Sequence, residues 1–247
     1  MNAAPADQIR LLDVQALDVR LQQLAHRRRS LAEHAEIESL TKEHAQLRDL
    51  LVAAQTEESD CGREQTKAEQ DVDQVRRRAA RDQQRLDSGA VTSPKDLENL
   101  QREITSLAKR QGDLEDVVLE VMERRESVQE RVGELTGRVA SVQERIDDAT
   151  GRRDAAVGEI DGEAASVTKE RGVIAATVPA DLLRLYDKLR EQQGGVGAAK
   201  LHQRTCQGCR QELAITELAE VRSAAPDTVL RCENCHRILV RTADSGL

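Results

Sequence analysis

The sequence predicts a mainly α-helical protein: a long antiparallel coiled-coil helical hairpin followed by a small C-terminal β zinc ribbon. Three observations lead to this fold class. First, 33% of the residues are charged and Tyr186 is the only aromatic residue, whereas compact cores draw much of their buried area from aromatic side chains. Second, two long stretches without proline carry a seven-residue apolar repeat. Third, four cysteines near the C-terminus form two C-x₂-C pairs.

The heptad repeat is clearest in residues 95–175. Steps of three and then four residues from Leu97 to Ile174 meet an apolar residue at 18 of 23 positions, and the phase never slips. A coiled coil keeps such a phase over many heptads. Intrinsic disorder is the alternative for a highly charged chain with few aromatic residues, but a disordered chain would not keep the phase, and we reject it.

The preceding stretch, residues 7–87, has no proline and a single glycine, Gly62, but its repeat is noisier. The leucines from Leu17 to Leu31 follow one phase, and a different phase starts at Leu40. The register therefore changes between Leu31 and Leu40, as an insertion or a local rewinding of the supercoil would produce.

The segment Ser88–Pro94 separates these two stretches, which are about equal in length. At 1.5 Å per residue each helix would be roughly 120 Å long. A short connection makes neighbouring helices antiparallel. The alternative is one continuous rod in a parallel oligomer, but Gly89 and Pro94 argue against it. Residues that face each other should have numbers that sum to about 182, and we hypothesise that a Glu58–Arg125 pair helps to set this register.

The hairpin is expected to occupy residues 1–177, with its loop at 88–94. Residues 178–195 should form a connecting helix and a Gly-rich link, because Pro179 suits a first helical turn and Gly194-Gly195 suits a helix end. Residues 196–247 should form the C4 zinc ribbon. Its short alternating segments are expected to be strands, at residues 198–205, 211–215, 228–232 and 237–241.

The two cysteine pairs predict one structural Zn²⁺ ion. Four thiolates complete a tetrahedron with Zn–S distances of about 2.3 Å and leave no position for a reactive water. Two disulfides are an alternative that a reducing cytoplasm disfavours, and a thioredoxin-type redox pair would need a βαβ pattern that is missing here. The predicted ligands are Cys206, Cys209, Cys232 and Cys235.

Three further residues have side chains that can bind a metal or react. His202 and His236 are alternative zinc ligands, but four correctly spaced cysteines already complete the site. We expect His236 to occupy a turn position that often takes glycine. Cys61 lies at a core heptad position, and we expect a buried small hydrophobe rather than a reactive thiol.

Several classes of protein are disfavoured. No run of 18 apolar residues exists to span a membrane, and the N-terminus lacks the basic and apolar regions of a secretory signal, so a cytoplasmic location is expected. The sequence contains neither a P-loop nor a G-x-S-x-G motif. We therefore expect no enzymatic activity, no catalytic residues and no small-molecule substrate.

The sequence also resembles a bacterial family of C4-type zinc-ribbon proteins with a long N-terminal coiled-coil hairpin. The residues that carry the resemblance are Val178–Tyr186, the Gly-rich link, both cysteine pairs, Arg237-Ile238-Leu239, and Pro94–Ile104 after the hairpin loop. The sequence departs from the family pattern at His236, where glycine is usual, and at Val240, where tyrosine is frequent. The resemblance implies a helical hairpin that carries a zinc ribbon. It also implies a binding role, since members are regarded as nucleic-acid-binding or protein-interaction regulators, some tied to transcription or secretion machinery.

Two kinds of partner are consistent with these features. We favour an adaptor or regulator that binds protein through the coiled coil and the ribbon. The alternative is an RNA- or DNA-binding regulator, because arginine pairs well with phosphate. On the helices, Arg27–Arg29 and Arg76–Arg78 more often serve as solvated or paired flanks of a heptad seam. The candidate contact residues of the ribbon are Arg204, Arg210, Arg231, Arg237 and Arg241.

The sequence allows two alternatives for the association of hairpins and two for the apolar side of the ribbon. Hairpins of this kind can pair into a homodimer, and the repeat alone does not decide whether they do. The apolar side of the ribbon either packs on the connecting helix or is open to a partner; its residues are Leu213, Ile215, Ile238 and Val240.

Overall fold

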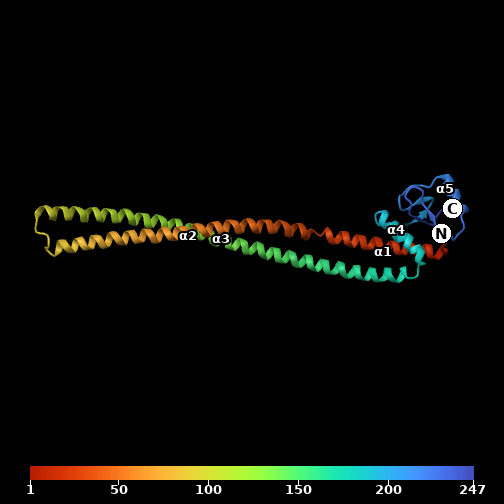
Figure 1. Cartoon of the computed structure of the whole chain (residues 1–247), viewed down its shortest axis with the longest axis horizontal. Helices are drawn as coiled ribbons and strands as arrows, with labels where there is room; N and C mark the ends of the chain where they lie inside the picture. The colour runs from red at the N-terminus through yellow and green to blue at the C-terminus, as the bar shows by residue number, and fades with distance from the viewer. The chain divides into compact units, whose positions relative to one another are not determined.

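The computed structural model of the protein describes all residues from 1 to 247 and confirms the predicted mainly α-helical fold (Figure 1). No helix is both long and apolar enough to cross a membrane. The elements, in chain order, are α1 (Pro5–Arg29), α2 (Ala32–Asp87), α3 (Pro94–Ala175), α4 (Ala180–Gln192), β1 (Ala198–His202), β2 (Thr205–Cys206), α5 (Ile215–Ser223), β3 (Leu230–Arg231) and β4 (Ile238–Val240).

The chain divides into two compact units. The hairpin unit consists of residues Ala35–Ala149, and the ribbon unit combines Met1–His34 with Thr150–Leu247. Helices α2 and α3 each contribute to both units. The domain boundaries expected after residues 177 and 195 stay a prediction. The compact unit that holds the cysteines also takes in α1, the C-terminal part of α3 and α4.

In the hairpin unit, α2 and α3 run antiparallel (Figure 1) and bury a single apolar seam between them. Helix α2 ends at Asp87 and α3 begins at Pro94, so residues 88–93 connect the two helices. Gly89 adopts a φ of 67° in this loop, a left-handed conformation that glycine adopts without strain. One apolar cluster of the seam has members spaced by seven residues on each helix: Leu40, Leu47, Ala54, Leu135, Val142 and Ala149.

The register of the hairpin differs from the predicted one. The predicted Glu58–Arg125 ion pair is present, with Oε1 and Nη2 3.6 Å apart. However, the apolar layers of the seam pair residues whose numbers sum to 189, such as Leu47 and Val142. The register of 182 is therefore wrong by one heptad. Several cross-helix ion pairs agree with the observed seam, with numbers that sum to 188: Glu43–Arg145, Glu57–Arg131 and Glu64–Arg124.

A break in the helix accounts for the noisy phase of the first stretch. Helix α1 ends at Arg29 and α2 begins at Ala32. The N–H of Ser30 donates to the carbonyl of His26 at 3.0 Å, and the N–H of His34 donates to that of Leu31 at 3.2 Å. The chain thus interrupts one helix and starts another next to the predicted change of phase, so the apolar stripe restarts at a new angle.

One apolar core of the ribbon unit is built from α1, α4 and the sheet. Leu11 and Val14 of α1 and Leu182 and Leu189 of α4 lie within it. Tyr186 of α4 is fully buried in the same core, next to Ile238 and Val240 of β4. The lone aromatic residue therefore lies where α1, α4 and the sheet meet.

The four strands form one sheet in the order β2-β1-β4-β3. The central pair, β1 and β4, is parallel, and the two outer pairs are antiparallel. The predicted strand at 211–215 is reduced to an isolated bridge between Thr205 and Glu212, because α5 already begins at Ile215. The N-terminus adds a second bridge, between Asn2 and Thr228, which no pattern in the sequence indicated.

Candidate metal centre

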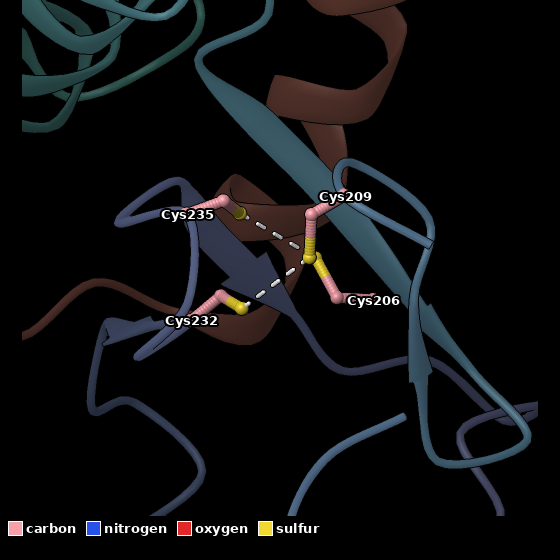
Figure 2. Close-up of side chains that lie close together, drawn as sticks. All are labelled: Cys206, Cys209, Cys232 and Cys235. Atoms are coloured by element: carbon pink, nitrogen blue, oxygen red, sulfur yellow. Dashed lines mark hydrogen bonds between the residues drawn. The ribbon is translucent and has the colours of Figure 1, made fainter. Parts of the chain in front are cut away.

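The four cysteines of the two C-x₂-C pairs come together in the ribbon unit. Their sulfur atoms all lie within 4.8 Å of one another. The Cys206 and Cys235 sulfurs are 3.8 Å apart and those of Cys209 and Cys232 are 3.9 Å apart, as the dashed lines in Figure 2 mark. Sulfurs held about 2.3 Å from a tetrahedral zinc ion would be about 3.8 Å from each other. The free thiols therefore fit the size of a four-sulfur zinc site.

The two cysteine turns have the same backbone arrangement. The residue after each pair, Arg210 or His236, has a positive φ of 58° or 59°. Its N–H donates to the carbonyl of the first cysteine of its pair, at 2.7 Å to Cys206 and 2.8 Å to Cys232. The predicted turn position of His236 is thus confirmed, and neither His202 nor His236 belongs to the thiol cluster.

The cysteine turns rest on a second apolar core, built from both sides of the ribbon. Cys206 and Cys232 are fully buried against Leu201, Leu239 and Leu218 of α5. Helix α5 is tied to the second turn by a buried carboxylate, because Glu217 accepts a hydrogen bond of 3.0 Å from the N–H of Glu233. The short helix between the two pairs therefore supports the site, which explains their wide separation in sequence.

The electrostatics of the cluster favour a bound cation. Burial raises the pKa of Cys206 and that of Cys232 above the ordinary range of a thiol, although backbone amides donate to both sulfurs. Burial also acts to raise the pKa of Cys235, but the amide and side chain of Arg237 and the neighbouring thiols outweigh it, so that this pKa is lowered. Four crowded thiolates repel one another, and a doubly charged ion reduces this repulsion.

Two of the five predicted contact arginines hold the ribbon unit together internally. The guanidinium of Arg237 donates to three backbone carbonyls, including those of Val196 and Gln193, both at 2.9 Å. It also passes close to Gly208, where a Cβ would lie 2.8 Å from Cδ of Arg237. The guanidinium of Arg241 donates to five carbonyls of α5 and of the segment that joins α5 to β3: those of Val221, Ala224, Ala225, Pro226 and Thr228.

The other three arginines are exposed on the ribbon surface. The Nε–H of Arg231 donates a hydrogen bond of 2.9 Å to the carbonyl of His236. Arg204 and Arg210 have positive φ values of 64° and 58°, and none of the three has a carboxylate within 4.0 Å. The ribbon therefore presents three unneutralised cations, all in or beside the turns around the cysteine cluster.

The apolar side of the ribbon is mostly covered. Ile238 and Val240 pack with α1 and α4, and Leu213 is buried with the cysteines. Of the four residues considered, only Ile215 stays exposed, at 89%. Cys61 belongs to the hairpin unit and is 3% exposed, as predicted for a buried small hydrophobe.

The ribbon unit also contains a buried charge cluster that no pattern in the sequence indicates. Asp18 of α1 is 1% exposed and binds Arg171 of α3 at 2.8 Å and Arg190 of α4 at 2.9 Å. The hydroxyl of Tyr186 donates to the same carboxylate at 2.7 Å. Burial and then this hydrogen bond raise the pKa of Tyr186, and the bond to Asp18 raises the pKa of Arg171. The cluster joins three helices around one carboxylate.

Together, a two-helix coiled-coil hairpin and a sheet with four clustered cysteines define a C4 zinc-ribbon protein of the coiled-coil type. Residues 14–194 match the family of the CT398-like coiled coil hairpin domain, and residues 205–239 match the C4-type zinc ribbon domain. The chain belongs to the CT398-like coiled-coil hairpin family. Both descriptions point to a non-enzymatic protein, and the ribbon match with the four clustered cysteines indicates a zinc ion.

Relatives and solved structures agree with this assignment. An uncharacterized protein of Mycobacterium tuberculosis is 36% identical over 241 residues, which cover 98% of both chains. A solved structure from Mycobacterium smegmatis is 34% identical, with a TM-score of 0.87 over 98% of this chain and all of the other. The CT398 structure from Chlamydia trachomatis is 18% identical, with a TM-score of 0.71 over 96% of this chain and 98% of the other, and supports the fold alone.

Proposed function

We propose that the protein is a non-enzymatic, zinc-binding adaptor or regulator that acts in the cytoplasm through protein–protein contacts of its coiled coil and zinc ribbon. The observation that carries this proposal is the thinness of the hairpin core. Buried residues recur only about every seventh position along α2 and α3 in the hairpin unit. Most of the surface of both helices therefore stays available to a partner.

The ribbon has a supporting role in this proposal. Cys206, Cys209, Cys232 and Cys235 would bind one Zn²⁺ ion as thiolates, and four sulfurs would close its coordination shell. The ion would supply positive charge and folding free energy rather than chemistry at a reacting bond. It would hold the two turns in place and so fix the surface that carries Arg204, Arg210 and Ile215.

Capture of partners tests the adaptor function. The full chain, tagged at its C-terminus because the N-terminus pairs with Thr228, is used as bait in a lysate of the source bacterium, with and without nuclease. We expect the same proteins to be retained under both conditions. An adaptor function is contradicted if nuclease releases every retained protein, because nucleic acid would then be the bridge.

A second function is favoured by one specific observation, the three exposed arginines of the ribbon. Arg204, Arg210 and Arg231 have no carboxylate partner, and arginine binds phosphate in a bidentate way. Arg237 and Arg241, which are bound to backbone carbonyls within the ribbon unit, would add positive charge beneath this surface. We propose RNA or DNA binding by this surface as the alternative. Gel shifts at low salt should then be abolished when the three exposed arginines become Glu, and the alternative fails if the unmodified protein gives no shift.

A further inference from the structure

Charge is unevenly distributed along the hairpin unit. We define the hairpin end as residues 76–110, which include the loop and the adjacent turns of α2 and α3. The hairpin end has nine Lys or Arg against five Asp or Glu, a net charge of +4. The rest of the hairpin unit, residues 35–75 and 111–149, has nine Lys or Arg against 22 Asp or Glu, a net charge of −13. The hairpin end is therefore positively charged, whereas the rest of the hairpin unit is strongly negative.

Part of this positive charge is not neutralised within the hairpin. Arg76 and Arg78 pair with Glu115 and Glu103 across the two helices. Four other cations of the hairpin end are exposed and have no carboxylate within 4.0 Å. We call them the unpaired cations: Arg81, Lys95, Lys109 and Arg110. These four groups are available to an external anion.

Three of the four unpaired cations come from the two helices at a similar level, and Lys95 lies nearer the loop, at the start of α3. The ion pairs Arg76–Glu115 and Arg78–Glu103 place residues 76–78 of α2 beside residues 103–115 of α3. Lys109 and Arg110 lie within residues 103–115 of α3. Arg81 lies about one helical turn after residues 76–78 of α2. On α2, Arg77, Arg81 and Arg85 are spaced by four residues, so they share one helix face. Cations of both helices can therefore contact one ligand.

We propose that the hairpin end docks an acidic segment of a protein partner. This inference rests on the proposed adaptor function and specifies the chemistry of the partner. The hairpin end is short, because residues 76–87 of α2 span about 18 Å and residues 94–110 of α3 about 26 Å at 1.5 Å per residue. A short run of Asp and Glu side chains matches this length, and charge complementarity would speed its association and select against basic partners.

A nucleic acid matches the hairpin end less well. A duplex carries one charge per about 1.7 Å of its axis and continues beyond a patch of this size. It would then run along helices that carry a net charge of −13. The hairpin also lacks aromatic side chains, since Tyr186 is the only one in the chain, and so offers single strands no surface for stacking.

The test measures binding of a fluorescent acidic peptide, a Glu-Ser repeat, to the full-length protein by anisotropy. A Gln-Ser repeat, a single-stranded oligonucleotide and a DNA duplex serve as comparison probes. We expect the acidic peptide alone to bind well and its affinity to fall as salt is added. The variant Arg81→Glu/Arg110→Glu should weaken binding at least about fivefold, because it replaces two attractive charges by repulsive ones.

A matched control changes the net charge by the same amount elsewhere in the hairpin unit. Arg48→Glu/Lys67→Glu also reverses two exposed cations of α2 that have no carboxylate partner, and it should leave peptide binding within about twofold. Circular dichroism should show unchanged helicity in both variants, since no seam residue is altered. Equal loss in both variants, no binding of the acidic peptide, or tighter binding of either nucleic acid would overturn the proposal.

The outcome separates this proposal from the adaptor function. If nuclease-resistant partners are captured from lysate equally by the native chain and by Arg81→Glu/Arg110→Glu, the docking site is wrong and the adaptor function stands. If the peptide binds as expected but every captured protein is released by nuclease, the adaptor function fails while the acidic-ligand site remains.

Discussion

In the hairpin unit, Glu57 and Arg131 pair across the helices with about half of each side chain exposed. In the ribbon unit, Asp18 is 1% exposed and is bound by Arg171, Arg190 and Tyr186. Exposed pairs contribute about 0–1 kcal/mol each, whereas breaking a buried, fully matched charge costs about 3–5 kcal/mol. The stability of the hairpin unit therefore depends on many ion pairs that each contribute little free energy. The stability of the ribbon unit depends on a few buried sites that each contribute several kcal/mol.

Loss of the metal should produce the largest difference in stability between the two units. In Cys232→Ser one thiolate ligand is missing, and zinc affinity should collapse, because metal binding supplies folding free energy of about 10–16 kcal/mol in small zinc modules. We expect hydrogen exchange to show lost protection at residues 198–240 with protection kept in the seam of residues 35–149. Zinc content, which we propose to be one ion per native chain, should fall in the same preparation.

The matched control is Cys61→Ser, which removes a buried thiol of the hairpin unit. It should leave both the zinc content and the protection of residues 198–240 unchanged. A Cys232→Ser protein that still holds one zinc ion with an intact ribbon would show that the ligand set is wrong.

Removal of the buried carboxylate should give the next largest effect. Asp18→Ala leaves two guanidinium groups and the Tyr186 hydroxyl without their common partner, so we expect a loss of about 3–5 kcal/mol in the unfolding free energy of the ribbon unit. Glu57→Ala, which removes an exposed pair of the hairpin unit, should cost at most about 1 kcal/mol. Hydrogen exchange, monitored at increasing denaturant concentration, measures the loss of unfolding free energy in both variants. Similar losses in the two variants would remove the contrast between the units.

These two sites also differ in how far the sequence reveals them. The cysteine pairs have a fixed spacing that points to one ion, and the four sulfurs do cluster. Asp18 has no such signal, because its partners lie more than 150 residues away on α3 and α4. A single aspartate near an apolar stripe looks like any solvated helix residue until the helices are packed. The same holds for Arg237 and Arg241, whose carbonyl partners exist only in the folded ribbon.

The lone tyrosine offers a pH test of the buried cluster. Burial, and then the bond to Asp18, raise the pKa of Tyr186 above its ordinary value of about 10. The protonated hydroxyl therefore favours the folded state. This contribution is fully present below about pH 10, and above it stability should fall by about 1.4 kcal/mol for each pH unit.

Absorbance of the phenolate measures this titration without ambiguity, because the chain has one tyrosine and no tryptophan. We expect a midpoint well above the ordinary value in the folded protein and a return to that value in denaturant. In Tyr186→Phe the alkaline loss of stability should be correspondingly smaller. Titration at the ordinary value in the folded protein would mean that α4 does not bury this side chain against Asp18.

The smallest expected effect tests the register of the hairpin unit, which heptad patterning leaves undetermined. A shift of seven residues moves every apolar position onto another apolar position, so registers of 182 and 189 bury similar seams. In the structure Glu57 pairs with Arg131, whereas a shift by one heptad to the register of 182 would bring Arg124, seven residues before Arg131, opposite Glu57. Glu57→Arg and Arg131→Glu should each cost at most about 1 kcal/mol, and the double variant should recover most of that loss. Glu57→Arg/Arg124→Glu is the matched control, and it should show no recovery in denaturant unfolding. Recovery with Arg124 in place of Arg131 would move α2 by two turns against α3 and return the hairpin to the register of 182.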